Sequence, residues 1–155
     1  MPSDIQYYPN NGQYIPIPST IYAQYYDYGQ CPNPCRKYHI SSALDGAEEV
    51  AGLVLPYLAS RKIFNKVVKA RSLLSKQTSG SQAGKFITIY MNANVEHRNA
   101  VIRELGTRLA DLSRERGVKP CPTVPKSRGY SHVFIEQPLD DGMFIYGGFV
   151  CDPSE

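Results

Sequence analysis

The chain has 155 residues, 42% of them hydrophobic, so it is long enough to form one domain with its own core. Its formal net charge is only +3, and the basic residues are spread along the chain, which does not suit a nucleic-acid binder. No apolar run is long enough to span a membrane, and the first residues lack the basic and apolar regions of a signal peptide. We therefore expect a cytoplasmic protein that binds neither nucleic acid nor membrane.

Residues 1–36 differ in composition from the rest of the chain. They hold seven of the twelve tyrosines and half of the prolines, with few aliphatic residues and no helical periodicity. Such a segment is typical of an extended arm, which either packs its tyrosines over the domain or orders only with a partner. The domain itself is expected over residues 37–155.

The first elements of that domain are short. Residues 37–40 are predicted as a strand, and residues 46–60 as a helix whose last turn is disturbed by Pro56. A β-branched run at 63–68 is predicted as a second strand. The Ser/Gly-rich stretch 77–84 is predicted as a loop.

The stretch 85–92 alternates strictly between apolar and other residues, which is the period of a half-buried strand. Its second face presents Tyr90 and Asn92, both candidates for contact with a substrate. On the earlier strand, Lys37 and His39 are two positions apart and so share a face. An amine, an imidazole and a phenol on sheet surfaces suggest proton transfer on an anionic substrate.

The end of the chain is predicted to contain one long helix and two strands. The helix spans residues 95–116 and is followed by a proline-punctuated loop at 119–129. The strands are predicted at 131–136 and 143–150, joined as a hairpin. The fold class is therefore α+β: a mostly antiparallel sheet with two main helices in a single domain.

The four cysteines, Cys31, Cys35, Cys121 and Cys151, are expected to be reduced thiols, because disulfides are rare in the cytosol. Cys31 and Cys35 form a C-x3-C pair, but no second pair of matching spacing completes a metal site. The chain also lacks phosphate-binding loops and the motifs of zinc proteases and serine hydrolases. The sequence thus supports neither a metal nor a nucleotide cofactor.

Three motifs in order resemble those of the phosphothreonine/phosphoserine lyase family. They are Lys37-Tyr38-His39-Ile40-Ser41, Phe64-Asn65-Lys66 and Gly84-Lys85-Phe86-Ile87-Thr88-Ile89-Tyr90. The family includes type III secretion effectors that inactivate MAP kinases and the N-terminal lyase domains of class III and IV lanthipeptide synthetases. The third motif is closest to the lanthipeptide branch, and Tyr-Gly-Gly-Phe at 146–149 also resembles the end of that domain. The resemblance covers roughly residues 20–150.

This resemblance implies β-elimination of phosphate from phosphoserine or phosphothreonine, which leaves dehydroalanine or dehydrobutyrine and requires no metal or cofactor. By resemblance, Lys66 matches the general base and His39 the general acid. Lys37 matches a phosphate-binding lysine, and Tyr90 an essential tyrosine near the substrate. The alternative for Lys66 is a surface lysine whose amine reaches water, and for Tyr90 a core tyrosine.

The proposed base needs an unusual environment. A lysine amine accepts a proton only when neutral, so the pKa of Lys66 must fall well below the ordinary ~10.4. Apolar Phe64 and Val68 are expected to lower it, and so is the charge of Lys37. His39 must instead be protonated, which a phosphate dianion in the substrate favours.

The chain departs from the family pattern at two arginines. Residues 78–83 contain none, and Phe144-Ile145-Tyr146-Gly147 stands where lanthipeptide lyases usually have Tyr-Arg-Tyr-Gly. Arg128 lies where the family has another arginine. Lys69 and Arg71 are further candidates for holding phosphate in place of the missing groups.

The leading hypothesis is a stand-alone lyase that acts on a phosphorylated precursor peptide. The chain stops where the kinase domain of a class III synthetase would start, so a separate kinase and a separate cyclase are expected partners. One alternative is an effector lyase that acts on a host kinase. The other, suggested by the missing arginines, is a non-catalytic phosphopeptide-binding or scaffold protein with the lyase fold.

Overall fold

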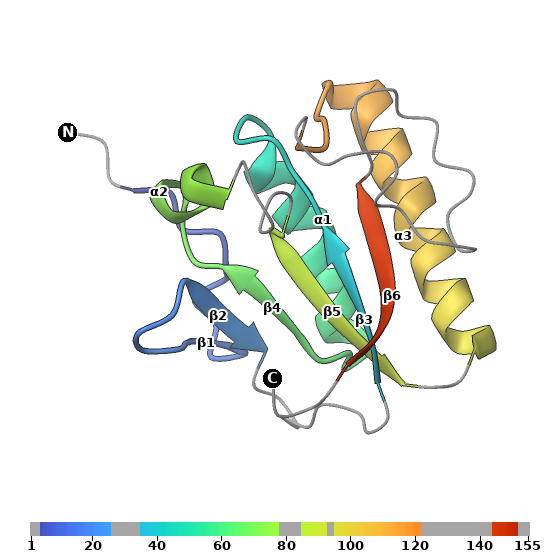
Figure 1. Cartoon of the computed structure of the whole chain (residues 1–155). Helices are drawn as coiled ribbons and strands as arrows, with labels where there is room; N and C mark the ends of the chain where they lie inside the picture. The colour runs from blue at the N-terminus through green and yellow to red at the C-terminus, as the bar shows by residue number, and fades with distance from the viewer. Residues whose placement is uncertain (1–3, 26–34, 78–84, 93–94, 122–143, 152–155) are drawn as a thin grey trace.

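Six strands and two long helices make up the described part of the chain (Figure 1). The computed structural model describes residues 4–25, 35–77, 85–92, 95–121 and 144–151, and its account of side chains leaves out residues 77, 92, 95 and 146–151. The strands are β1 (Tyr14–Pro16), β2 (Tyr22–Tyr25), β3 (Cys35–Ile40), β4 (Asn65–Val68), β5 (Ile87–Asn92) and β6 (Ile145–Cys151). The helices are α1 (Ala47–Ser60), the short α2 (Arg71–Leu74) and α3 (Val95–Arg116), and a 3-10 turn, η1, covers Ser75–Gln77.

The strands form one sheet in the order β1-β2-β4-β5-β3-β6, and each pair of neighbours is antiparallel. Helix α1 lies behind the strands and α3 lies beside β6 (Figure 1), and both helices contribute side chains to one core. The predicted α+β class, with an antiparallel sheet and two main helices, is confirmed. Among the described residues, no helix combines the length and the apolar character needed to cross a membrane.

Both helices predicted from apolar periodicity are present. Helix α3 has the predicted bounds, and α1 runs through Pro56 to Ser60. The N-cap of α1 is Gly46, whose φ of 93° lies in the left-handed region that favours glycine. A Cβ on Gly46 would lie 2.7 Å from Cγ1 of Val118, so the glycine also allows the segment after α3 to pack closely.

The core lies between the sheet and the two helices. Ile87, Ile89 and Met91 of β5 face the helix layer as predicted, but the strand is not half-buried, because Thr88 and Tyr90 on its other face are buried as well. The strand predicted at 143–150 is present as β6, whereas the one predicted at 131–136 lies outside the described residues. The helices contribute aliphatic stripes made of Val50, Val54, Leu55, Leu58, Val101, Ile102, Leu105 and Leu109.

Residues 4–25 add strands to the same sheet, although the sequence placed them in an arm ahead of the domain. Tyr14 and Tyr25 are buried in the core, in line with the first of the two expectations for the arm. Beyond that packing, the segment supplies β1 and β2, and β2 pairs with β4. The sequence did not reveal these strands because three or four residues, one of them Pro16, are too few to display an alternating pattern.

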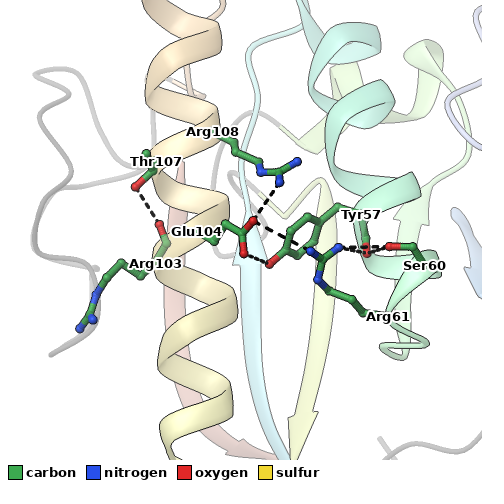
Figure 2. Close-up of polar contacts among 7 residues, drawn as sticks. All are labelled: Tyr57, Ser60, Arg61, Arg103, Glu104, Thr107 and Arg108. Carbon is green, nitrogen blue, oxygen red and sulfur yellow. Dashed lines mark hydrogen bonds and ion pairs between the residues drawn. The ribbon is translucent and has the colours of Figure 1, made fainter.

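A polar cluster joins α1 to α3 (Figure 2). The Tyr57 hydroxyl donates to Glu104 Oε2 at 3.0 Å, and Arg108 Nη2 donates to Glu104 Oε1 at 2.8 Å. The guanidinium of Arg61 lies over the Tyr57 ring, 3.6 Å from its centroid. Burial, together with the bond to Glu104, raises the pKa of Tyr57 to about 12. The same hydrogen bond is the main cause that lowers the pKa of Glu104.

The cluster makes part of the stability of the fold dependent on pH. Because the pKa of Glu104 in the folded chain lies below its ordinary 4.5, the contribution of the carboxylate is present above that pH and is lost as the pH falls through the folded value. We expect Tyr57→Phe to lower the urea midpoint slightly at pH 7, and this deficit to shrink toward pH 3. Tyr8→Phe, away from the cluster, is the control. A Tyr57→Phe deficit that is the same at pH 7 and pH 3 would contradict this role of Glu104.

Candidate active site

The residues assigned by resemblance come from three adjacent strands and share one face of the sheet. Directly paired residues of antiparallel strands point to the same side. Lys66 of β4 and His39 of β3 both pair with Thr88 of β5, so these three form a row across the sheet. Lys37 pairs with Tyr90 in the neighbouring row. This side, which we call the site face, is opposite to the one covered by α1 and α3.

The amine of Lys66 lies among aromatic rings on the site face. Its Nζ is 4.2 Å from the ring centroid of Tyr22 and 5.9 Å from that of Tyr90. The Phe64 ring meets the Tyr90 ring edge-on, with 5.2 Å between their centroids. Lys66 itself is half-buried, so its amine is partly withdrawn from water.

This environment lowers the pKa of Lys66. Burial is the largest cause, and the positive charges of Lys37 and Lys85 add to it. The direction and two of its causes agree with the expectation from the sequence, which named an apolar setting and Lys37. The contribution of Lys85 was not anticipated, although Lys85 belongs to the motif that contains Tyr90 and therefore had a sequence signal.

One nitrogen of the His39 ring contacts a buried threonine of β5. It is only 4% exposed, and its Nδ1 lies 3.1 Å from Oγ1 of Thr88, which is 1% exposed. This contact fixes the ring plane and engages Nδ1, so the tautomer depends on which of the two atoms donates. Sequence reasoning passed over Thr88, yet the alternation of β5 already placed it on the same face as Tyr90.

Tyr90 lies on β5, directly opposite Lys37 of β3 on the site face. It is 6% exposed and forms a small cluster with Cys35 and Phe64.

Cys35 is disulfide-bonded, to a cysteine whose side chain lies outside the described residues, so the expectation that all four cysteines are reduced is wrong for Cys35. Cys121 is buried and is not in a disulfide.

Two of the predicted phosphate-binding residues, Lys69 and Arg71, hydrogen-bond to main-chain oxygens. The Lys69 amine donates to the main-chain oxygens of Ile17 and Thr20, at 2.9 and 2.7 Å. Arg71 donates to the main-chain oxygen of Leu44, and it also pairs with an aspartate that precedes α1. These contacts tie Lys69 to the turn between β1 and β2, and Arg71 to the segment before α1.

Two further candidates cannot be placed with the others. Arg128 lies outside the described residues. The backbone of Asn92 pairs with Cys35 in the sheet, but its side chain is outside the description. Within the described ranges, no three His, Cys, Asp or Glu side chains are grouped so that they could hold a metal ion.

Comparison with known proteins agrees with the lanthipeptide branch of the resemblance. The family model described as the RamC, N-terminal domain, which is related to lanthipeptide synthetases, matches residues 24–117. That range includes Lys37, His39, Lys66 and Tyr90 and more than half of the chain. No curated protein matches the chain significantly. The chain belongs to the RamC N-terminal domain family.

Proposed function

We propose that this protein is a phosphoserine/phosphothreonine lyase with Lys66 as the general base. The observation that supports this most directly is the state of the Lys66 amine: it is half-buried, its pKa is lowered, and it shares a sheet face with Lys37, His39 and Tyr90. A base that abstracts a weakly acidic proton works best when its pKa lies near the working pH, and burial beside other cations moves a lysine in that direction.

In the proposed reaction, neutral Lys66 Nζ removes the α-proton of the phosphorylated residue. The electron pair of the Cα–H bond becomes the Cα=Cβ double bond as the bond from Cβ to the phosphate oxygen breaks. His39 gives a proton to that oxygen, and its Nε2 is the proposed donor because Nδ1 is engaged with Thr88. The products are dehydroalanine or dehydrobutyrine and inorganic phosphate.

The other cations would stabilise charge rather than move protons. Lys37 lies beside His39 on β3 and is proposed to bind the phosphate group, which becomes the leaving anion. Lys85, whose charge acts on Lys66, would strengthen the same field. Tyr90 is proposed to donate a hydrogen bond to the substrate as negative charge develops on its carbonyl oxygen.

The proposed substrate is a precursor peptide phosphorylated by a separate kinase, and a separate cyclase would consume the dehydro residues. The match to a family related to lanthipeptide synthetases supports this setting. Dehydro residues are electrophiles, so a peptide that carries them is a suitable substrate for attack by cysteine thiols. The chemistry therefore requires phosphorylation before this step and thiol addition after it.

Mass spectrometry of phosphopeptides incubated with the pure protein tests the proposed function. Elimination removes phosphoric acid, about 98 Da per site, whereas hydrolysis of the ester removes about 80 Da. We expect the 98 Da loss from pSer or pThr peptides and no change in the unphosphorylated peptides. A loss of 80 Da would contradict the proposal.

A second candidate function is phosphopeptide binding without turnover. It is favoured by the two arginines of the family pattern that the sequence lacks, and by the main-chain oxygens that Lys69 and Arg71 engage. This candidate predicts a peptide that binds and keeps its mass. Titration of a fluorescent phosphopeptide, followed by mass analysis of the same sample, separates it from the lyase.

A further inference from the structure

The N-terminal hairpin contributes a side chain to the surroundings of Lys66. Strand β2 pairs with β4 so that Gln24 lies directly opposite Lys66, and Tyr22 opposite Val68. Tyr22 is therefore a diagonal neighbour of Lys66 on the same face, at a distance that an aromatic side chain spans. Its ring lies 4.2 Å from Lys66 Nζ, closer than any other ring in the described part of the chain.

This hairpin is fastened to β4 at both ends. Near one end, the Tyr14 hydroxyl donates to Oδ1 of Asn65, the residue next to Lys66, at 2.8 Å. Near the other, the Lys69 amine holds the main-chain oxygens of Ile17 and Thr20 in the turn between β1 and β2. The position of Tyr22 over Lys66 is thus set by the fold and not by a loose surface contact.

We infer that Tyr22 is a positioning residue: its ring holds the Lys66 amine on the site face. A catalytic role for this contact rests on the proposed function, whereas the contact between the Tyr22 ring and Lys66 Nζ does not depend on it. It assigns a part in the site to a residue that precedes the range matched by the family model. It also means that the hairpin of β1 and β2 is part of the candidate site.

The ring of Tyr22 also acts on the charge of Lys66, in opposition to the other groups. The described titratable groups around the amine are Lys37 and His39 from β3, Tyr90 from β5, Lys85 before β5, and Tyr22. Burial and the two lysines favour the neutral amine, whereas the face of an aromatic ring favours the ammonium ion. Tyr22 therefore limits how far the pKa of Lys66 falls and keeps the amine basic enough to take a proton.

The direct test measures the pKa of Lys66 without using activity. The rate at which a trace of acetic anhydride acetylates Lys66 is followed against pH by peptide mass spectrometry. We expect Tyr22→Leu, which keeps apolar cover but removes the ring, to lower this pKa by about 0.5 to 1 pH unit. Tyr22→Phe keeps the ring and should leave it unchanged. Tyr8→Leu, beside α1, is the matched control.

Activity gives the second readout. In the wild type, kcat should rise with pH as Lys66 loses its proton. In Tyr22→Leu, this rise should occur at a lower pH, by the same 0.5 to 1 pH unit as the shift in the pKa of Lys66. The maximal kcat should fall, and KM should change little. Tyr22→Phe, which keeps the ring, should retain the wild-type pH profile and kcat. Tyr22→Met serves as a second variant without a ring if Tyr22→Leu folds poorly. An unchanged pKa of Lys66 in both ringless variants would overturn the inference. A shifted pKa in a protein that eliminates no phosphate would overturn the proposed function and leave the inference standing.

Discussion

Lys66→Met is expected to reduce phosphate elimination by about 10²–10⁴-fold, the usual contribution of a positioned general base. Methionine has nearly the length of lysine and no amine, so it removes the proton acceptor and keeps the packing against Tyr22 and Tyr90. The fold should tolerate the change, because the positive charges of Lys37 and Lys85 no longer face a third cation. The measurement is the single-turnover rate of the 98 Da loss, with the melting temperature recorded for the same samples.

The matched control for this experiment is Lys76→Met, at an exposed lysine of η1. It should eliminate phosphate at the wild-type rate. The wild type should also become faster as the pH rises through the lowered pKa of Lys66, because only the neutral amine accepts a proton. Elimination that persists in Lys66→Met at a wild-type rate would remove Lys66 from the mechanism.

Asn65→Ala is expected to lower the free energy of unfolding by about 2–3 kcal/mol, since it leaves two buried polar groups without partners. Asn65 is 0% exposed. Its Oδ1 accepts from the Tyr14 hydroxyl at 2.8 Å, and its Nδ2 donates to the main-chain oxygen of Ile63 at 2.7 Å. Burial raises the pKa of Tyr14, so its hydroxyl stays a donor throughout the working pH range. Urea unfolding at pH 7 measures the effect.

A smaller change isolates one of the two bonds. Tyr14→Phe removes only the hydroxyl, so a loss of about 1 kcal/mol is expected, and the double variant should lose less than the two single changes added together. Asn10→Ala, at an exposed position of the same N-terminal segment, is the control. If Asn65→Ala costs no more than Asn10→Ala, the buried bonds do not fasten the hairpin to β4.

The sequence predicted the elements whose patterns are long. Helix α3 was found with its bounds because its apolar stripe repeats over 22 residues, and β5 because six residues alternate without interruption. The hairpin of β1 and β2 was missed because its strands are short, and because what stabilises them is pairing with β4, more than forty positions away in the chain. The local propensity of residues 14–25 gives no information about pairing with β4.

The same distinction explains the candidate site. The shared face of Lys37 and His39 followed from alternation within one strand, which is a local pattern, whereas the pairing that adds Tyr90 to that face is set by the register of β3 against β5. The main-chain partners of Lys69 and Arg71 did not follow from the sequence, because the partner of a long cationic side chain is decided by which carbonyl oxygens the fold brings near it. A lysine that fastens a turn and a lysine that binds phosphate look identical in a sequence.

The order of strands has a consequence for how this protein is made. Strand β3 lies between β5 and β6, so its neighbours in the sheet are synthesised long after it. His39 meets Thr88 across 49 positions of chain, and loops of that length close slowly compared with the formation of helices. During synthesis, α1 can therefore form while β3 still has two unpaired edges. The row of Lys66, Thr88 and His39 across β4, β5 and β3 exists only after the chain has emerged through β5, when α3 and β6 still have to be added.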